Sequence, residues 1–155
     1  ALNGIVDIFL PDFKYISSEM AARYSNAPDY PEVAKRALAQ MVKQTGDAKF
    51  DERDMMKRGV IVRHLILPGH IKESKKAIRY LYETYGDQIY ISIMNQYTPM
   101  PGIEKRFKNL GRTITQREYD EVVDYAVDLG VENGFIQEGE TAKESFIPQF
   151  DDTGL

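Results

Sequence analysis

The sequence predicts an α/β protein with a parallel sheet, made of about three units in which a strand is followed by a helix. Apolar runs at 5–15, 59–69 and 88–97 alternate with segments whose apolar residues recur at helical spacing. Each run is apolar at nearly every position, which is typical of parallel strands that are covered on both faces. The alternation therefore favours a parallel sheet with right-handed crossovers.

The first unit starts with the strand at 5–15, which is followed directly by a short helix. Ser17, Ser18 and Glu19 offer an N-terminal cap for this helix, which we expect at about 19–25. Side chains alternate along a strand, so Ile8, Leu10, Asp12 and Lys14 share one face, while Phe9, Pro11 and Phe13 share the other.

A longer helix lies within residues 28–46 and completes the first unit. Pro31 falls where a first helical turn tolerates proline, and Gly46 ends the helix. Its apolar stripe has helical spacing and consists of Val33, Ala34, Ala37, Leu38, Met41 and Val42.

The second unit repeats this order of elements. A charged, polar loop at 47–58 leads into the strand at 59–69, and a helix follows within 70–86. Gly86 ends that helix. Its inward-facing residues are Ile71, Ala77, Ile78, Leu81, Tyr82 and Tyr85.

The third unit begins with the strand at 88–97 and ends with a helix within 115–130. A long loop rich in glycine, proline and basic residues joins the two, and Thr115 and Glu118 have the spacing of a capping box. The remaining tail suggests one more short strand at Gly134–Gln137 and is otherwise irregular and acidic. The sequence shows no linker that would separate a second domain, so residues 1–155 are expected to form a single domain.

Composition excludes several classes of protein. The chain has 155 residues with 43% hydrophobic content, enough for a substantial core. Lysine and arginine total 20 against 24 aspartate and glutamate residues, which gives a net charge of -4 and disfavours nucleic-acid binding.

The cysteine count and the length of the apolar runs narrow the classes further. The absence of cysteine excludes disulfides, thiolate-bound zinc and an iron–sulfur cluster held by this chain. No apolar run reaches the roughly 20 residues of a membrane span, and the N-terminus does not resemble a signal peptide. We therefore expect a cytoplasmic protein with no membrane contact.

Polar side chains gather where the predicted strands end. Asp12 and Lys14 end the first strand, the second carries Arg63 within an apolar run, and the third ends in Asn95, Gln96 and Tyr97. Ligands of parallel α/β folds bind at the carboxyl ends of the strands, so this convergence predicts a binding site.

Several of these residues also have structural explanations. Arg63 is as well suited to pairing with Asp12 as to contacting a ligand, because a buried guanidinium needs an anion. We expect His64, on the opposite face, to be a hydrogen-bonded core residue, and His70 to cap the following helix. The loop residues Lys105, Arg106, Lys108 and Arg112 fit a solvated charge run, although their place after a strand permits contact with an anion or a partner protein.

Four stretches together resemble the second half of a radical S-adenosylmethionine protein of the pyruvate formate-lyase activating enzyme type. They are "DIFLPDFKY", "KRGVIVRHLILPGH", "YISIMNQYTPMPG" and "EYDEVVDYAVDLGVENGFIQE", and they extend over most of the chain, roughly residues 4–150. The resemblance implies half of a (β/α)6 barrel, that is, a partial (β/α) barrel with about three parallel units. It also implies a 4Fe–4S cluster and reductive cleavage of S-adenosylmethionine to a 5′-deoxyadenosyl radical.

The resemblance also implies roles for individual residues. The Asp-Leu-Lys strand end of the family corresponds to Asp12, Phe13 and Lys14, which places Asp12 and Lys14 in the S-adenosylmethionine and cation-binding part of the site. Arg63 corresponds to the arginine before the family's Pro-Gly turn. Where better-known activating enzymes have a histidine, this sequence has Asn95, Gln96 and Tyr97, any of which could contact the cofactor.

The chain departs from the family in lacking the Cys-xxx-Cys-xx-Cys loop and the glycine-rich strand that contacts the methionine amino group. In the family both belong to the N-terminal half of the barrel. We therefore expect the chain to be a C-terminal fragment of a longer enzyme, inactive on its own. Its expected partners are a protein substrate, such as a glycyl radical enzyme, and an electron donor.

Two other functions remain open. One is an aldolase-like lyase in which Lys14, with its pKa lowered among apolar neighbours, forms a Schiff base with a carbonyl substrate. The other is a non-catalytic binding or assembly module that acts through an open sheet edge, by which such a fragment could also dimerise.

Overall fold

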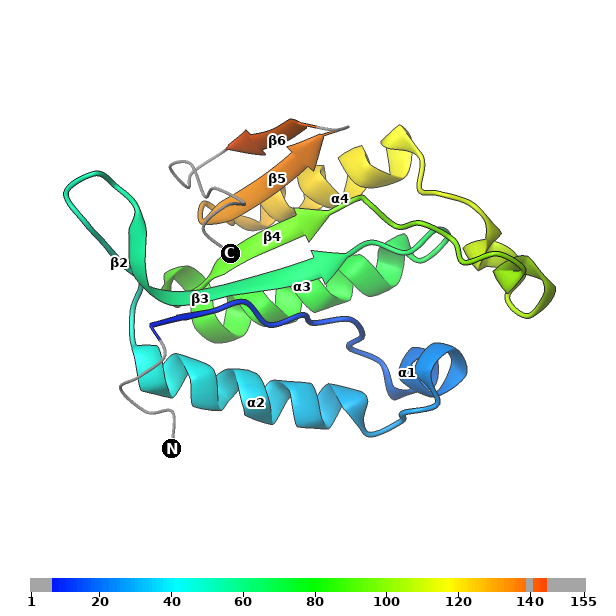
Figure 1. Ribbon diagram of the computed structural model, residues 1–155, viewed down its shortest axis with the longest axis horizontal. Coiled ribbons are helices and arrows are strands. Elements are labelled where there is room, and N and C mark those ends of the chain that lie inside the picture. The colour runs from blue at the N-terminus through cyan, green and yellow to red at the C-terminus, as the bar shows by residue number, and fades with distance from the viewer. Residues whose placement is uncertain (1–6, 139–140, 145–155) are drawn as a thin grey trace.

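The computed structural model describes residues 7–138 and 141–144. Four strands form the parallel part of its sheet: β1 (Ile8–Phe9), β3 (Met56–Leu65), β4 (Tyr90–Met94) and β5 (Gly134–Glu138). They lie side by side in chain order (Figure 1).

Two further strands are antiparallel to their neighbours. The short strand β2 (Lys49–Phe50) pairs with β3, and β6 (Thr141–Glu144) pairs with β5 at one edge. The sheet is open and the fold is mixed α/β. The expected partial (β/α) barrel of about three parallel units is therefore wrong. The alternation of strands and helices predicts which strands are neighbours, but it contains no signal for the antiparallel strands and no requirement for barrel curvature.

Among the described residues, four α-helices accompany the sheet: α1 (Ser18–Ser25), α2 (Tyr30–Thr45), α3 (Ile71–Tyr85) and α4 (Gln116–Leu129). Short 3-10 turns occupy Gly86–Gln88, Ile103–Lys105 and Lys108–Gly111. Within the described part of the chain, no helix has the length and apolarity needed to cross a membrane.

Helix caps follow the sequence signals in most places. The Ser17 side chain accepts a hydrogen bond from the Met20 amide at the start of α1, and Thr115 and Glu118 form the predicted capping box of α4. His70 precedes α3, but its side chain makes no capping bond, so that expectation is wrong. Its Nε2 lies 2.6 Å from the Tyr24 hydroxyl instead, because the ring turns toward α1.

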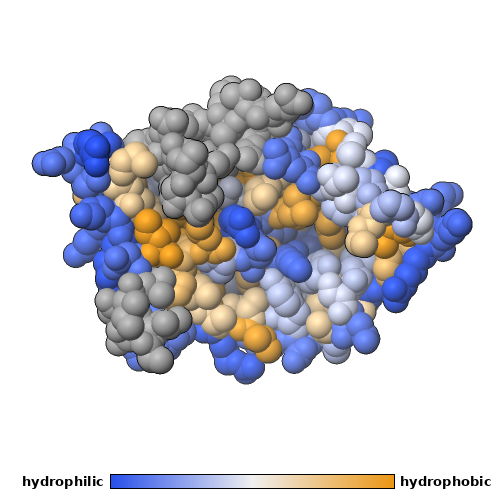
Figure 2. Space-filling model, viewed as in Figure 1, coloured by the Kyte–Doolittle hydropathy of each residue, from blue (hydrophilic) through white to orange (hydrophobic). Residues whose placement is uncertain are grey.

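The main core lies between the sheet and the helices on one face. Residues of β3 and β4 contribute to it together with residues of α2, α3 and α4, including Val60, Val62, Leu81, Ile91 and Val122. A smaller apolar cluster lies on the opposite face, formed by Met56, Ile61 and Tyr90 with Ile8, Leu10, Ala48 and Phe50. Figure 2 shows apolar surface over the middle of the molecule, between hydrophilic surfaces at its two ends.

Candidate functional site

The chain after β1 stays beside β3 for several residues and thereby fixes the predicted pair of charged side chains. The Arg63 amide donates to the Pro11 carbonyl and the Phe13 amide donates to the Arg63 carbonyl, each at 2.8 Å. Phe13 is buried in the main core, whereas Asp12 and Lys14 are exposed on the other face. The alternation predicted for this strand is confirmed.

A cavity of about 280 Å³ lies at the carboxyl ends of the strands on the face that carries Asp12 and Lys14. Asp12 and Lys14 come from the segment after β1, Arg63 belongs to β3, and Met94 belongs to β4. The lining consists of Asp12, Lys14, Tyr15, Arg63, Leu65, Leu67, Met94 and Tyr97. Parallel strands bring these segments together although they are far apart in the sequence.

Arg63 and Asp12 form the ion pair that the sequence allowed, with 2.8 Å between Nε and Oδ1. Both side chains are partly exposed, at 39% and 48%, so the pair is expected to stabilise the fold by no more than about 1 kcal/mol. Within residues 7–138, no hydrogen bond or ion pair engages the terminal nitrogens of Arg63 or the Nζ of Lys14. The cavity is therefore lined by two cationic groups with free hydrogen-bond donors and by the apolar side chains of Leu65, Leu67 and Met94.

The end of β4 contributes only part of the predicted set. Tyr97 lines the cavity, but its hydroxyl donates to the Leu110 carbonyl at 2.7 Å, and burial raises its pKa. Gln96 is exposed, and neither it nor Asn95 lines the cavity. Asn95 follows Met94 and faces the other side of the strand, as alternation requires. Four of the six predicted site residues are thus brought together.

Tyr30, which the sequence analysis did not identify, binds the segment after β1 on the side that faces away from β3. Its hydroxyl accepts a hydrogen bond from the Lys14 amide at 2.9 Å and donates to the Asp12 carbonyl at 3.0 Å. These two backbone groups point away from β3, where a neighbouring strand would otherwise satisfy them. A single phenol thus takes the place of a strand backbone, and no sequence motif would have indicated this.

Replacing Tyr30 with phenylalanine should remove both bonds and leave the ring in place. We expect the free energy of unfolding to fall by about 1 kcal/mol, since water reaches the freed groups. Hydrogen exchange should also accelerate at the Lys14 amide. Tyr24→Phe is the matched control, because its hydroxyl bonds a side chain and not this backbone. Unchanged exchange at Lys14 in Tyr30→Phe would show that the phenol does not hold the segment.

The buried His64 fixes the same segment from inside. Its Nδ1 lies 2.8 Å from the Phe13 carbonyl oxygen and its Nε2 lies 2.8 Å from Ser74 Oγ of α3. A carbonyl only accepts, so Nδ1 carries the proton and Nε2 accepts from the serine hydroxyl. Burial lowers the pKa of His64, which keeps the ring neutral. As the sequence predicted, it is a hydrogen-bonded core residue.

Glu73, another residue not singled out from the sequence, holds the chain just after the cavity. Its Oε2 accepts hydrogen bonds from the Ile16 and Ser17 amides at 2.7 and 2.8 Å. It lies in the first turn of α3, where the helix dipole favours a carboxylate. The turn that leads into α1 is therefore anchored to α3.

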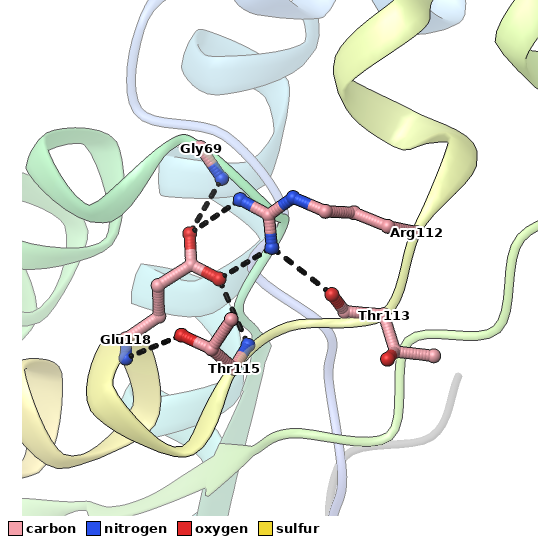
Figure 3. Close-up of polar contacts among 5 residues, drawn as sticks. All are labelled: Gly69, Arg112, Thr113, Thr115 and Glu118. Atoms are coloured by element: carbon pink, nitrogen blue, oxygen red, sulfur yellow. Dashed lines mark hydrogen bonds and ion pairs between the residues drawn. The ribbon is translucent and has the colours of Figure 1, made fainter.

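A network around Glu118 joins the two loops that follow β3 and β4 (Figure 3). Its carboxylate accepts bonds from the Gly69 amide at 2.8 Å and the Thr115 amide at 2.9 Å. The two terminal nitrogens of Arg112 donate to its two oxygens at 2.7 and 3.0 Å. Arg112, followed by these amides, lowers the pKa of Glu118 to about 2. The Arg112 guanidinium is therefore committed to this network, although its side chain is 48% exposed.

The metal-binding capacity of the described residues is limited. Within residues 7–138 and 141–144, no three histidine, cysteine, aspartate or glutamate side chains are grouped so as to hold a metal ion. The full sequence contains no cysteine, so no residue of this chain can ligate an iron–sulfur cluster through a thiolate.

Comparison with known proteins identifies a distant relative but assigns no family. No family model matches the chain. Over 125 residues, which are 81% of the chain, it is 28% identical to Uncharacterized protein MJ0674 of Methanocaldococcus jannaschii. The matched region is 32% of the length of that protein, so the chain spans about a third of the relative that it matches.

Proposed function

We propose that this chain is the C-terminal part of a radical S-adenosylmethionine protein of the pyruvate formate-lyase activating enzyme type, and that it forms one wall of the S-adenosylmethionine site. The observation that supports the proposal most is the cavity shared by Asp12, Lys14, Arg63 and Tyr97. These residues come from three segments of the chain, yet they line one cavity. The resemblance places Asp12 and Lys14 in the cofactor region, matches Arg63 to the arginine before the family's Pro-Gly turn, and makes Tyr97 one of three candidates for contact with the cofactor.

The residues of the cavity suit the chemistry of S-adenosylmethionine. Its carboxylate would be held by the free donors of Arg63 and Lys14, since guanidinium and ammonium groups bind carboxylates through charge-assisted bonds. The Asp12 carboxylate would accept a bond from an ammonium or ribose hydroxyl group. Leu65, Leu67 and the other apolar lining would exclude water from the less polar part of the ligand.

The iron–sulfur cluster does not fit this chain, because the chain has no cysteine. The proposal therefore places the cluster ligands in another segment of the full-length protein. The relative in Methanocaldococcus jannaschii is about three times as long as the region it shares with this chain, which is compatible with such a segment. A protein substrate, an electron donor and a cytoplasmic location belong to the same proposal.

Reconstitution of these 155 residues with iron and sulfide should produce no cluster. The physical reason is the lack of thiolate ligands. The measurement is the visible absorption spectrum after anaerobic reconstitution and desalting. A charge-transfer band that stays with the protein would contradict the proposal that the cluster ligands lie in another segment of the full-length protein.

The proposal is tested on the full-length natural protein that contains this chain. After anaerobic reconstitution and reduction, it should convert S-adenosylmethionine to 5′-deoxyadenosine, measured by chromatography and mass spectrometry. Lys14→Met should lower the yield at limiting S-adenosylmethionine by roughly tenfold or more, because a charge-assisted bond is lost. Lys43→Met, on the exposed side of α2, is the matched control and should leave the yield unchanged. Absence of 5′-deoxyadenosine from the wild-type protein would overturn the proposal.

The Schiff-base alternative receives less support. It requires a lysine enclosed by apolar groups, whereas Lys14 is exposed. Borohydride reduction with candidate aldehydes and ketones should therefore add no mass at Lys14.

The second alternative is a binding module that acts through the open sheet edge. It predicts a stable dimer or complex, so a monomer across micromolar concentrations would count against it.

A further inference from the structure

Two arginines flank a pair of packed aromatic rings on a surface formed by α1 and the loop after β4. Both segments lie at the same end of the molecule (Figure 1). The Arg23 guanidinium lies 5.2 Å from the ring centroid of Tyr24, and the Tyr24 ring packs edge-to-face on Phe107 with 4.9 Å between centroids. The Arg106 guanidinium lies 5.2 Å from the Phe107 centroid. We call these four residues, together with His70 against Tyr24, the Arg–aromatic surface.

A groove of about 720 Å³ continues from this surface between α1 and the first turns of α3. Arg23 and His70 belong to both features. Met20 and Ile71 are the apolar residues of the groove, and Lys72 and Lys76 are exposed along it. The surface and the groove therefore form a continuous region built from α1, α3 and the loop that follows β4.

The charges of this region do not balance. Glu73 is buried and already accepts two backbone amides, and Glu121 is paired with Lys75 at 2.9 Å, which leaves Glu19 as the exposed acid of the groove. Within the described part of the chain, no ion pair engages the four remaining cations, Arg23, Lys72, Lys76 and Arg106. A positive region thus stands out on a chain whose net charge is -4.

We propose that the Arg–aromatic surface and the adjoining groove bind an acidic segment of a partner protein. Its carboxylates would pair with Arg23, Arg106 and the two groove lysines, and an apolar side chain would contact Met20 and Ile71. The Tyr24 and Phe107 rings contact the two guanidinium groups and restrict their positions before binding. The arginine side chains therefore lose less conformational entropy when an acidic ligand binds. The proposal concerns a different surface from the cofactor cavity and does not depend on the proposed reaction.

Nucleic acid fits this surface less well than an acidic peptide. The Tyr24 and Phe107 rings are packed against one another and are partly buried, so they do not present two free faces for base stacking. The net negative charge of the chain would also repel a long polyanion.

Binding of a fluorescent peptide to the 155-residue chain tests the proposal. The probe is a peptide of roughly 12 residues that contains glutamate, aspartate and one leucine, and its anisotropy is measured against a variant with glutamine and asparagine at the acidic positions. The acidic peptide should bind at least tenfold more tightly than the neutral one, and its affinity should fall between roughly 50 and 300 mM salt. Arg23→Glu with Arg106→Glu should lower the affinity by roughly tenfold or more.

The double substitution Lys43→Glu with Lys49→Glu is the matched control. It changes the net charge by the same amount, but both lysines are exposed and lie at the other end of the molecule, on the last turn of α2 and on β2 (Figure 1). It should leave the affinity within a factor of about two. Equal binding of the acidic and neutral peptides, or equal loss in both double variants, would overturn the proposal. Tighter binding of a single-stranded oligonucleotide than of the acidic peptide would also overturn it, and would identify nucleic acid as the ligand.

Discussion

Replacing His64 with phenylalanine is expected to lower the free energy of unfolding by about 3 kcal/mol. The imidazole is 1% exposed and bonds both the Phe13 carbonyl and the Ser74 hydroxyl. A phenyl ring of similar shape would leave both groups buried without a partner, and the cost of an unsatisfied buried group exceeds the gain from the bond. Chemical denaturation followed by circular dichroism measures the change.

Two further variants separate hydrogen bonding from packing at this position. Adding Ser74→Ala to His64→Phe removes one orphaned hydroxyl, and we expect it to recover about 1 kcal/mol. His70→Phe is the matched control, since this partly exposed ring makes one side-chain bond, to Tyr24, and should cost no more than about 1 kcal/mol. Equal losses in His64→Phe and His70→Phe would contradict the role given to His64.

His64 also affects stability as a function of pH. Its pKa is lower in the folded than in the unfolded protein because burial disfavours the charged ring. The unfolded chain therefore takes up a proton below its ordinary value of 6.5 while the folded chain does not, so stability should fall as the pH drops below 6.5. This part of the pH dependence should be absent from His64→Phe.

Replacing Glu118 with alanine is the second large expected effect, with a loss of about 2–3 kcal/mol in the free energy of unfolding. The carboxylate is nearly buried and receives the Arg112 guanidinium and two backbone amides (Figure 3). Its removal also abolishes the capping box of α4. Glu118→Gln should cost less because the amide oxygen still accepts bonds.

Glu121→Ala is the matched control for this substitution. Glu121 lies one turn further along α4 and pairs with Lys75, but it is 45% exposed, so its loss should cost no more than about 1 kcal/mol. Comparable losses of unfolding free energy in the two alanine variants would contradict the inference that Glu118 joins the loops after β3 and β4.

The pH dependence of the Glu118 contribution follows from its pKa of about 2 in the folded protein against an ordinary value of 4.5. The contribution is complete above about 4.5 and disappears as the pH falls toward about 2, with an expected total of about 3 kcal/mol. Acid denaturation of Glu118→Gln should lack this part of the transition, which lies at lower pH than the part due to His64.

Local patterns predicted much of the fold because they depend on neighbouring residues. Alternation placed Asp12 and Phe13 on opposite faces, and the spacing of Thr115 and Glu118 predicted the capping box. β2 was missed because its two residues lie in a charged segment that was expected to be a loop, and its pairing depends on β3. The partial barrel was wrongly predicted because the curvature of a sheet depends on packing between distant segments, which local patterns do not show.

The site was predicted only to the extent that strand ends determine it. Asp12, Lys14, Arg63 and Tyr97 meet because parallel strands end at the same edge. Asn95 and Gln96 were included because the sequence alone does not show which residues after β4 turn toward the cavity. Tyr30 was missed because its hydroxyl bonds backbone groups of residues far along the chain, and hydrogen bonds of this kind leave no local signature.

Binding of S-adenosylmethionine to the reconstituted full-length protein, measured by isothermal titration calorimetry, tests the central claim most directly. Arg58→Ala is the matched control for Arg63→Ala, because Arg58 lies on the same strand and pairs with Asp7 at 3.0 Å at the other end of β3. The account predicts that the wild-type protein and Arg58→Ala bind with similar affinity and that Arg63→Ala binds roughly tenfold more weakly or worse. No binding by the wild-type protein, or equal affinities of Arg63→Ala and Arg58→Ala, would contradict it.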